Sequence, residues 1–409
     1  MLNACKADCG SQRNRTSRRD RRIAVTVVEP AFRAGTAQGT TAAPEVAALF
    51  EPFTVNGLML PNRIAMAPMT RYMSPGGVPD AAVAGYYARR AEGGTGLIIT
   101  EGTLVGDPAC VAPAGVPRIH GEDALAGWAG VVDAVHAAGG TIVPQLWHVG
   151  IYREPGFVPE PPLTAVGPSG LDLAGEPFTE PMTDAQLAVA VDAYVRAAVD
   201  AQRIGFDGVE LHAAHGFLID QFLWPATNRR TDAYGGPPAA RARFGAEVVA
   251  AIRRATGPDF PIILRFSQWK VTDFQARIAQ DPDELADLLA PLTAAGVDAY
   301  HVSTRRFWLP AFDGSRLSLP AWTRRVTGRP VIAVGSVGLA DSDFQEAFEG
   351  AATRPASLER AVAAVEAGEF DLLAVGRAVL SDPYWAAKIR DGRTDELRPF
   401  DPASLETLT

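Results

Sequence analysis

The segment Gly208-Val-Glu-Leu-His-Ala-Ala-His-Gly-Phe-Leu-Ile-Asp-Gln-Phe-Leu-Trp-Pro-Ala-Thr-Asn-Arg-Arg-Thr-Asp-Ala-Tyr-Gly235 is the stretch from which the chain is best interpreted. It begins as a short apolar strand over residues 208–211, and we expect the loop that follows to carry His212 and His215. Two imidazoles at i and i+3 beyond a strand end can bind a metal, bind an anionic oxygen or perform acid–base catalysis. The rest of the sequence has to decide among these chemistries.

Strand-like runs alternate with Ala-rich segments that have helical spacing on both sides of this stretch. One such helix is predicted after Thr183, which forms a capping box with Gln186, and another opens at Asp281 and stops at Gly296. Eight strands that alternate with helices predict an α/β fold of the (β/α)₈ TIM-barrel type. A doubly wound sheet is the alternative, but no Gly-x-Gly-x-x-Gly follows the first strand. The predicted strands are residues 63–69, 96–102, 141–147, 208–212, 261–267, 299–304, 330–336 and 372–377.

Three further segments complete the predicted organisation. Asn56-Gly57 between two short apolar runs predicts an N-terminal β-hairpin. Long connections after the third and sixth strands, residues 151–182 and 305–320, have the length of lids or binding walls. Residues 1–45 carry an Arg-rich run and a short apolar patch, and we interpret them as a disordered N-terminal extension that precedes one barrel domain over 46–409.

Composition excludes several classes of protein. The net charge of −9 argues against nucleic acid as a partner, because binding a polyanion requires a basic surface. No apolar run approaches the roughly 18 residues that span a membrane. The three cysteines, Cys5, Cys9 and Cys110, are too few for a disulfide framework, so a cytoplasmic location is the default expectation.

Polar residues gather at the carboxyl ends of the predicted strands, where barrels of this type build their active sites. Glycines and a guanidinium after the last two strands suit a phosphate, and Arg265 at the end of the fifth strand suits a developing anion such as a reduced flavin. Gln145 offers both a donor and an acceptor to the edge of an amide-like ring. Together they describe FMN better than a sugar or a metal, and no metal site is predicted. The strand-end residues are Pro68, Met69, Thr70, Tyr72, Gly102, Gln145, Trp147, His212, His215, Arg265, Gly335, Ser336, Gly376 and Arg377.

Five separated motifs resemble those of the Old Yellow Enzyme family of NAD(P)H:flavin oxidoreductases. The similarity runs from about Leu49 to Trp385. The family is an FMN-containing (β/α)₈ barrel that takes hydride from NADPH or NADH and passes it to an activated alkene, such as an enone. The resemblance therefore implies FMN as cofactor and a small electrophilic alkene or quinone-like compound as substrate. The motifs are residues 67–70, 145–150, 212–223, 228–236 and 375–377.

The resemblance also implies a role for each of these residues. Thr70 is similar to the hydroxyl that tunes the flavin, and His212 and His215 are similar to the pair that binds the substrate carbonyl oxygen. The expected substrate walls are Tyr72, Trp147 and Phe217. The expected cofactor residues are Pro68, Met69, Thr70, Gly102, Gln145, Arg265, Gly335, Ser336, Gly376 and Arg377.

Phe217 departs from the family pattern. Family members usually carry Tyr at this position, where the phenol protonates the α-carbon of the substrate. A phenyl ring has no proton to donate, and losing a general acid costs roughly 10²–10⁴-fold where that step limits the rate. We therefore expect alkene reduction to be slow or specialised, with Tyr72 or water as the substitute donor, or substrates such as quinones and nitro compounds that need no carbon protonation.

Other functions remain open at this stage. A metal-dependent hydrolase would need more ligands beside the two histidines than the strand ends offer. A Schiff-base aldolase would need a strand-end Lys, and Lys270 is expected to lie beyond its strand. A non-catalytic or sensor FMN-binding barrel is the main alternative, because Phe217 removes the usual acid. The substrate, the choice between NADH and NADPH, and the oligomeric state are not set by the sequence.

Overall fold

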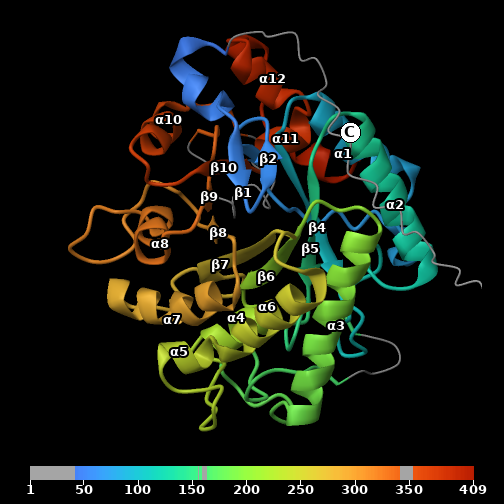
Figure 1. The fold of residues 1–409 in the computed structure, drawn as a ribbon, viewed down its shortest axis with the longest axis vertical. Coiled ribbons are helices and arrows are strands. Elements are labelled where there is room, and N and C mark those ends of the chain that lie inside the picture. The colour runs from blue at the N-terminus through green and yellow to red at the C-terminus, as the bar shows by residue number, and fades with distance from the viewer. Residues whose placement is uncertain (1–41, 155, 159–163, 341–352) are drawn as a thin grey trace, which may run out of the picture. The chain divides into compact units, whose positions relative to one another are not determined.

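Eight parallel strands close into a barrel at the centre of the protein, in the order β10-β3-β4-β5-β6-β7-β8-β9. Figure 1 shows the strands enclosed by helices, which confirms the predicted (β/α)₈ TIM barrel. The barrel strands are β3 (Ile64–Met66), β4 (Leu97–Leu104), β5 (Ile142–Trp147), β6 (Val209–His215), β7 (Ile262–Lys270), β8 (Ala299–Ser303), β9 (Val331–Val334) and β10 (Leu372–Val375).

The computed structural model describes residues 42–154, 156–158, 164–340 and 353–409, which belong to one unit of the chain, residues 39–409. The predicted extension over 1–45 lies outside these ranges except for residues 42–45. Pro44 already begins the short 3₁₀ helix η1 (Pro44–Phe50). The disorder of the extension stays a prediction.

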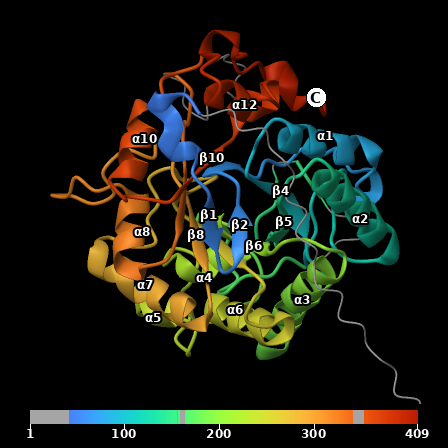
Figure 2. The same cartoon turned by 45° about the horizontal axis from the view of Figure 1, so that its top comes forward.

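Helices form the outer layer around the barrel, as the tilted view in Figure 2 shows. α3 begins at the predicted capping box of Thr183 and Gln186, and α7 begins at Asp281 and ends at Gly296, as predicted. The helices are α1 (Ala81–Glu92), α2 (Glu122–Ala137), α3 (Asp184–Arg203), α4 (Leu218–Leu223), α5 (Pro238–Arg241), α6 (Arg243–Thr256), α7 (Pro282–Ala295), α8 (Leu319–Thr327), α10 (Glu359–Glu366), α11 (Arg377–Ser381) and α12 (Trp385–Arg390), with the 3₁₀ turns η2 (Pro75–Gly77), η3 (Thr394–Glu396) and η4 (Pro402–Leu405).

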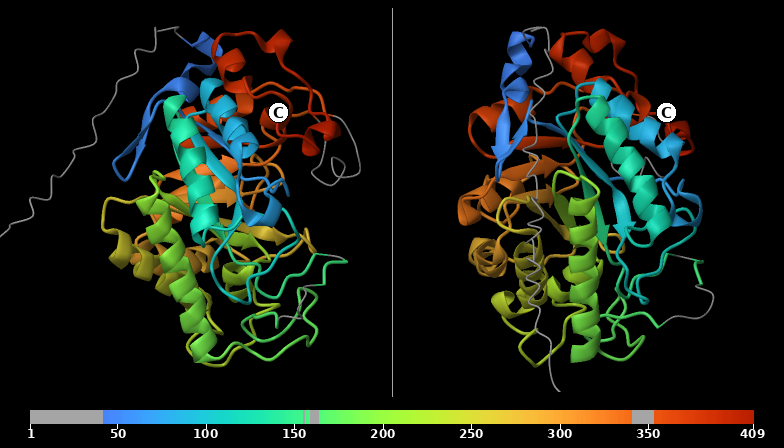
Figure 3. Two further views of the ribbon diagram at one scale, coloured as in Figure 1. Left: turned by 90° about the vertical axis from the view of Figure 1, so that its right-hand side faces the viewer. Right: turned by 45° about the vertical axis from the view of Figure 1, so that its right-hand side comes forward.

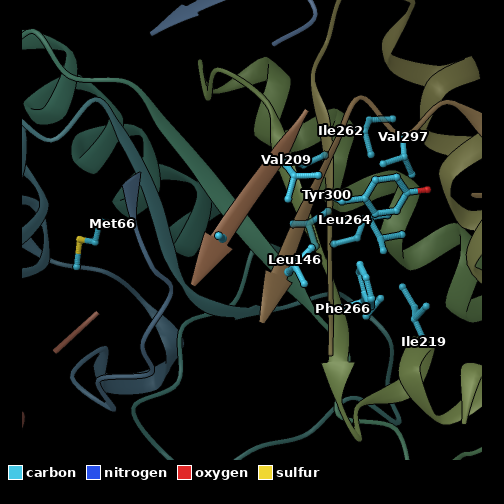
Figure 4. Close-up of a cluster of buried hydrophobic side chains, with 14 of the residues drawn as sticks. Met66, Leu146, Val209, Ile219, Ile262, Leu264, Phe266, Val297 and Tyr300 are labelled. Atoms are coloured by element: carbon cyan, nitrogen blue, oxygen red, sulfur yellow. The ribbon is translucent and has the colours of Figure 1, made fainter. Parts of the chain in front are cut away.

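Alternation along each strand divides the core into two parts. In β7, Ile262, Leu264 and Phe266 belong to the core between the barrel and the helices, part of which Figure 4 shows around Tyr300 and Ile219. Ile263, between them, belongs to a smaller core inside the barrel. Because successive side chains of a strand point to opposite faces, Arg265 takes the next inward position.

The N-terminal hairpin packs into one end of the barrel. β1 (Phe53–Val55) and β2 (Leu58–Leu60) are antiparallel, and Asn56 and Gly57 have φ of 43° and 80° between them, as the predicted turn requires. Val55 and Leu60 are buried in the core inside the barrel. The hairpin and the long loop after β5 lie at opposite ends of the barrel (Figure 3). The end that carries the long loop holds the carboxyl ends of the strands, where barrels of this type build their functional sites.

Both long connections occur where they were predicted. The connection between β5 and α3 spans residues 148–183, and the connection between β8 and α8 spans residues 304–318. The second is shorter than the predicted 305–320 because Ser318 caps α8, whose first residue is Leu319.

Two strands extend further than predicted, which corrects the placement of three residues. β6 continues to His215, so His212 and His215 lie in a strand and not in a loop. β7 continues to Lys270, so this residue ends a strand rather than following one. The local signal missed both extensions because polar residues inside the barrel interrupt the apolar pattern.

No helix in the described ranges is long and apolar enough to cross a membrane.

Candidate functional site

A cavity of about 490 Å³ lies where the carboxyl ends of the strands converge. Its size is within the range of about 300–1,000 Å³ that is usual for cofactor and small-molecule sites. All of the residues predicted from the sequence line this one cavity: Pro68, Met69, Thr70, Tyr72, Gly102, Gln145, Trp147, His212, His215, Phe217, Arg265, Gly335, Ser336, Gly376 and Arg377.

Further lining residues were not predicted. Tyr152, Glu154 and Phe157 come from the long loop after β5, whose role as a wall the sequence did indicate. Trp269 lies in the part of β7 beyond the predicted strand, and Ser303 lies inside the predicted sixth strand but was not assigned to the site. Phe400 and Leu405 come from the C-terminal segment, for which the sequence carries no signal.

A register shift between β6 and β7 brings the two histidines together. Simple alternation would place residues three apart on opposite faces of a strand. The pairing changes between Ala213 and His215, and His215 has φ of 65°. The ring centroids of His212 and His215 are 5.2 Å apart and edge-to-face, and both rings line the cavity. Irregularities of this kind redirect side chains next to active sites.

Both imidazoles are neutral near pH 7. Burial lowers the pKa of His212 and of His215 well below the usual value, and the Arg265 guanidinium lowers it further. His215 Nε2 lies 2.8 Å from Ser303 Oγ, while His212 Nδ1 is buried with no hydrogen-bond partner among the described residues. Neutral imidazoles can donate a hydrogen bond to an oxygen without requiring that the oxygen already carry a charge.

A layer of buried polar groups lies one step below the histidines. Glu210 Oε1 accepts a hydrogen bond from Gln145 Nε2 at 2.8 Å, and Glu210 Oε2 lies 2.7 Å from His301 Nδ1. All three side chains are buried. Because Glu210 holds the amide nitrogen of Gln145, the amide of Gln145 is fixed in orientation and its oxygen is left for a ligand.

Arg265 is a buried cation with an incomplete set of hydrogen bonds. Its Nε has no partner within the described part of the chain, and the hydrogen bond from its Nη2 to Ser303 Oγ is long, at 3.5 Å. Burial lowers the pKa of Arg265 to about 10, so the group remains charged at neutral pH. A buried guanidinium with free donors is costly unless a ligand acceptor completes it. The geometry therefore favours a ligand with electron-rich oxygen or nitrogen atoms.

A buried ion pair holds the backbone beyond His215. Lys270 Nζ lies 2.8 Å from Asp220 Oδ2, and both side chains are fully buried. Asp220 Oδ2 also accepts a 2.6 Å hydrogen bond from Gly216 N. The pair therefore connects the end of β7 to the turn that follows His215. Lys270 is thus already engaged, which removes the Schiff-base chemistry considered from the sequence.

Aromatic rings form one wall. The Phe217 ring contacts Trp147, His212 and Tyr152, with centroid separations of 4.9, 4.7 and 5.5 Å. Gly102 is required by the same wall, because a Cβ at this position would lie 2.7 Å from Trp147 Cε3.

The segment after β3 contributes Thr70 and Tyr72. Tyr72 has φ of 57°, and the Glu101 carboxylate accepts a 2.8 Å hydrogen bond from the neighbouring Arg71 N. The Tyr72 hydroxyl donates to Glu154, with oxygen separations of 3.1 and 3.2 Å. Its proton is therefore directed at a carboxylate at the rim of the cavity.

Glycines and an Arg occupy the ends of β9 and β10. Gly335 has φ of 150°, and a Cβ there would lie 2.6 Å from Thr304 O. Ser336 has φ of 52°, and its hydroxyl donates to Arg305 O at 2.9 Å. Among the described residues, a Cβ added at Gly376 would have two neighbours, Met69 Sδ at 3.6 Å and Ala67 Cβ at 4.0 Å, so there is open space beside the backbone. Arg377, the first residue of α11, lies next to this space.

Several other polar residues have structural partners. His148 Nε2 lies 3.2 Å from Asp107, and His136 Nε2 lies 3.0 Å from Asp207. Arg230 donates to the carbonyls of Pro168 and Met182, as expected for a loop-shaping residue. Residues 42–154, 156–158, 164–340 and 353–409 contain no group of three or more His, Cys, Asp or Glu side chains that could hold a metal ion.

We expect Lys270→Met to destabilise the protein by about 3–5 kcal/mol, because Asp220 would keep a buried charge without a partner. Chemical denaturation measures the change. Adding Asp220→Asn should recover most of the loss, since the amide oxygen still accepts from Gly216 N. A double variant no more stable than Lys270→Met would contradict this account of the pair.

We also expect His212 and His215 together to lower the free energy of unfolding as pH falls from 7 to 5. The folded pKa of each histidine is lowered, so the unfolded chain binds protons there first as pH falls below about 6.5, the usual histidine value. Each of the two histidines then lowers the free energy of unfolding by up to about 1.4 kcal/mol per pH unit. His212→Asn with His215→Asn should flatten the decline.

His136→Asn provides a control of opposite sign. A hydrogen bond to Asp207 raises the pKa of His136, so this residue adds stability in acid and its removal should steepen the decline. An unchanged slope in the double histidine variant would mean that the two imidazoles are not held neutral.

Comparison with known proteins places the chain among flavin-dependent oxidoreductases. The family model described as "NADH:flavin oxidoreductase / NADH oxidase family" matches residues 48–396. NADH oxidase of Thermoanaerobacter brockii is 33% identical, over 86% of this chain and 52% of the relative, so the chain spans about half of that protein. 12-Oxophytodienoate reductase 7 of Oryza sativa subsp. japonica is 34% identical, over 84% of this chain and 88% of the relative. The structure of morphinone reductase in complex with tetrahydroNAD is similar with a TM-score of 0.71 and 30% identity, over 87% and 93% of the two chains.

Proposed function

Because the chain belongs to the NADH:flavin oxidoreductase / NADH oxidase family, we propose that it is an FMN-dependent oxidoreductase. It takes reducing equivalents from NADPH or NADH and reduces a small electrophilic alkene such as an enone, or a quinone-like or nitro acceptor. The observation that carries the proposal is one cavity in which a buried, incompletely bonded Arg265 lies with two neutral imidazoles.

The cavity residues fit a flavin. Arg265 Nε is a buried donor with no acceptor among the described residues, and the electron-rich edge of an isoalloxazine ring supplies one. Gln145, oriented by Glu210, offers its amide oxygen to a ring N–H. Pro68, Met69 and Thr70 follow β3, which lies across the barrel from the Arg265 strand β7. They supply a hydroxyl and backbone groups to the cavity. When bound, FMN supplies hydride transfer between the nicotinamide and the acceptor.

One end of the cavity suits the phosphate of FMN. Gly335, Ser336 and Gly376 present backbone at the ends of β9 and β10, with open space beside Gly376. Arg377 adds a guanidinium, whose fork suits a phosphate. Loops after the last two strands of a barrel commonly bind phosphate.

His212 and His215 bind the acceptor oxygen. Each can donate one hydrogen bond, and their rings converge on the same space. Donors fixed in a buried site stabilise negative charge that develops on a carbonyl oxygen as the alkene is reduced. Trp147, Phe217 and Tyr72 shape the space around that oxygen.

The proposal has a direct alternative, a barrel that binds FMN without turnover. Steady-state oxidation of NADPH with a quinone acceptor separates the two functions. An enzyme turns over many equivalents, whereas a binding protein consumes at most one per flavin.

Arg265→Met should weaken FMN binding about 10- to 150-fold, because a charge-assisted hydrogen bond is worth about 1.5–3 kcal/mol. Titration with FMN, followed by quenching of flavin fluorescence, measures the affinity. Arg254→Met, on the exposed side of α6, should bind FMN as the unaltered protein does. Equal affinities for the two variants would exclude Arg265 from the flavin site.

Phe217→Tyr should raise the turnover of cyclohexenone about tenfold or more and leave quinone turnover within about twofold, because only the alkene needs a proton at carbon. Both rates are measured with saturating NADPH. A variant with unchanged cyclohexenone turnover and unchanged flavin reduction would show that the missing phenol does not limit alkene reduction.

A further inference from the structure

Two phenols line the cavity, and they differ in what their hydroxyls bind. Tyr72 is 45% exposed, and its hydroxyl donates to the Glu154 carboxylate. Its proton therefore points toward the rim, and Tyr72 can serve a substrate only after that bond breaks. This position makes it a poor replacement for an acid at Phe217.

Tyr152 lies at the same wall as Phe217. Its ring packs edge-to-face on the Phe217 ring, with centroids 5.5 Å apart and an interplanar angle of 83°. The side chain is half-buried and lines the cavity. No described residue forms a hydrogen bond with its hydroxyl, on which only burial and the charge of Glu154 act.

The backbone of Tyr152 is held in place. Arg153 Nη1 donates to Gly150 O at 2.9 Å and to Tyr152 O at 2.7 Å, and Tyr152 N donates to Val149 O at 3.2 Å. The phenol is thus presented by a fixed turn directly after β5. A fixed turn limits the conformational cost of placing a proton donor.

We propose that Tyr152 is the proton donor for alkene reduction, replacing the phenol that Phe217 lacks. The inference rests on the proposed function, since it needs a substrate in the cavity.

The step balances in atoms and electrons. When a hydride equivalent from the reduced cofactor adds to the β-carbon, the alkene π pair shifts to the bond between the α-carbon and the carbonyl carbon. The carbonyl π pair moves onto the oxygen held by His212 and His215, which gives the enolate. The oxygen pair then re-forms the carbonyl while the enolate carbon–carbon π pair makes a C–H bond at the α-carbon. The Tyr152 O–H bond breaks, and its electrons remain on the phenolate. Water at the rim then returns a proton to Tyr152.

The surroundings of Tyr152 keep its phenol protonated and make it a weaker acid than a phenol in water. Burial raises the pKa of Tyr152, and the Glu154 carboxylate raises it further. The phenol is therefore protonated at neutral pH, but ionising it costs more than in water. Such a donor suits alkene reduction that is present but slower than quinone reduction.

Tyr152→Phe tests the inference by separating two acceptors. We expect kcat with cyclohexenone to fall about 100-fold or more, with KM and quinone turnover within about twofold. Tyr384→Phe is the matched control, because this exposed phenol lies outside the cavity and binds Glu92. It should leave both activities unchanged.

A relocated phenol completes the test. Phe217→Tyr added to Tyr152→Phe should restore cyclohexenone turnover, because it returns an acid to the same wall. Unchanged cyclohexenone turnover in Tyr152→Phe overturns the inference, and so does an equal loss with both acceptors, which would indicate a structural role. If the unaltered protein turns over neither acceptor, the proposed function itself fails, and that result is visible before any variant is made.

Discussion

The site depends on the irregular pairing of β6 with β7. With regular pairing only one of the two histidines would line the cavity, because side chains three residues apart in a strand point to opposite faces of the sheet. The shift beyond Ala213, with His215 at positive φ, presents both rings at the same place. Strained backbone persists only where its surroundings hold it. Here the Asp220–Lys270 pair does so, through the hydrogen bond from Gly216 N.

The same strands set the electrostatics of the site. An apolar layer with Val143, Ile263 and Ala299 fills the barrel near the hairpin. Above it, Glu210 binds Gln145 and His301, and Arg265 follows in register beside His212. Burial keeps the histidines neutral by lowering their pKa, and the positive charge of Arg265 lowers it further. One buried cation therefore prepares a place for an electron-rich ligand and also contributes to the neutral state of the groups above it.

Local signals predicted most of the fold, and the residues predicted for the site all line one cavity. The Asn56-Gly57 turn and the Thr183–Gln186 box depend on neighbouring residues alone, and both were found as predicted. The loop assigned to His212 and His215 was wrong, because the β6 bulge depends on pairing with β7. Lys270 was misplaced for the same reason. Phe400 and Leu405 reach the cavity through the C-terminal segment, which Arg71 binds through backbone carbonyls, and no local pattern predicts that contact.

The central claim is that the layered cavity holds a flavin that a nicotinamide can reduce. The most direct test is the absorption spectrum of the purified protein with FMN, recorded without oxygen before and after NADPH is added. The account predicts a bound flavin spectrum that bleaches on reduction and returns when a quinone is supplied. A protein that stays colourless in the presence of FMN, or a bound flavin that NADPH leaves oxidised, would contradict it.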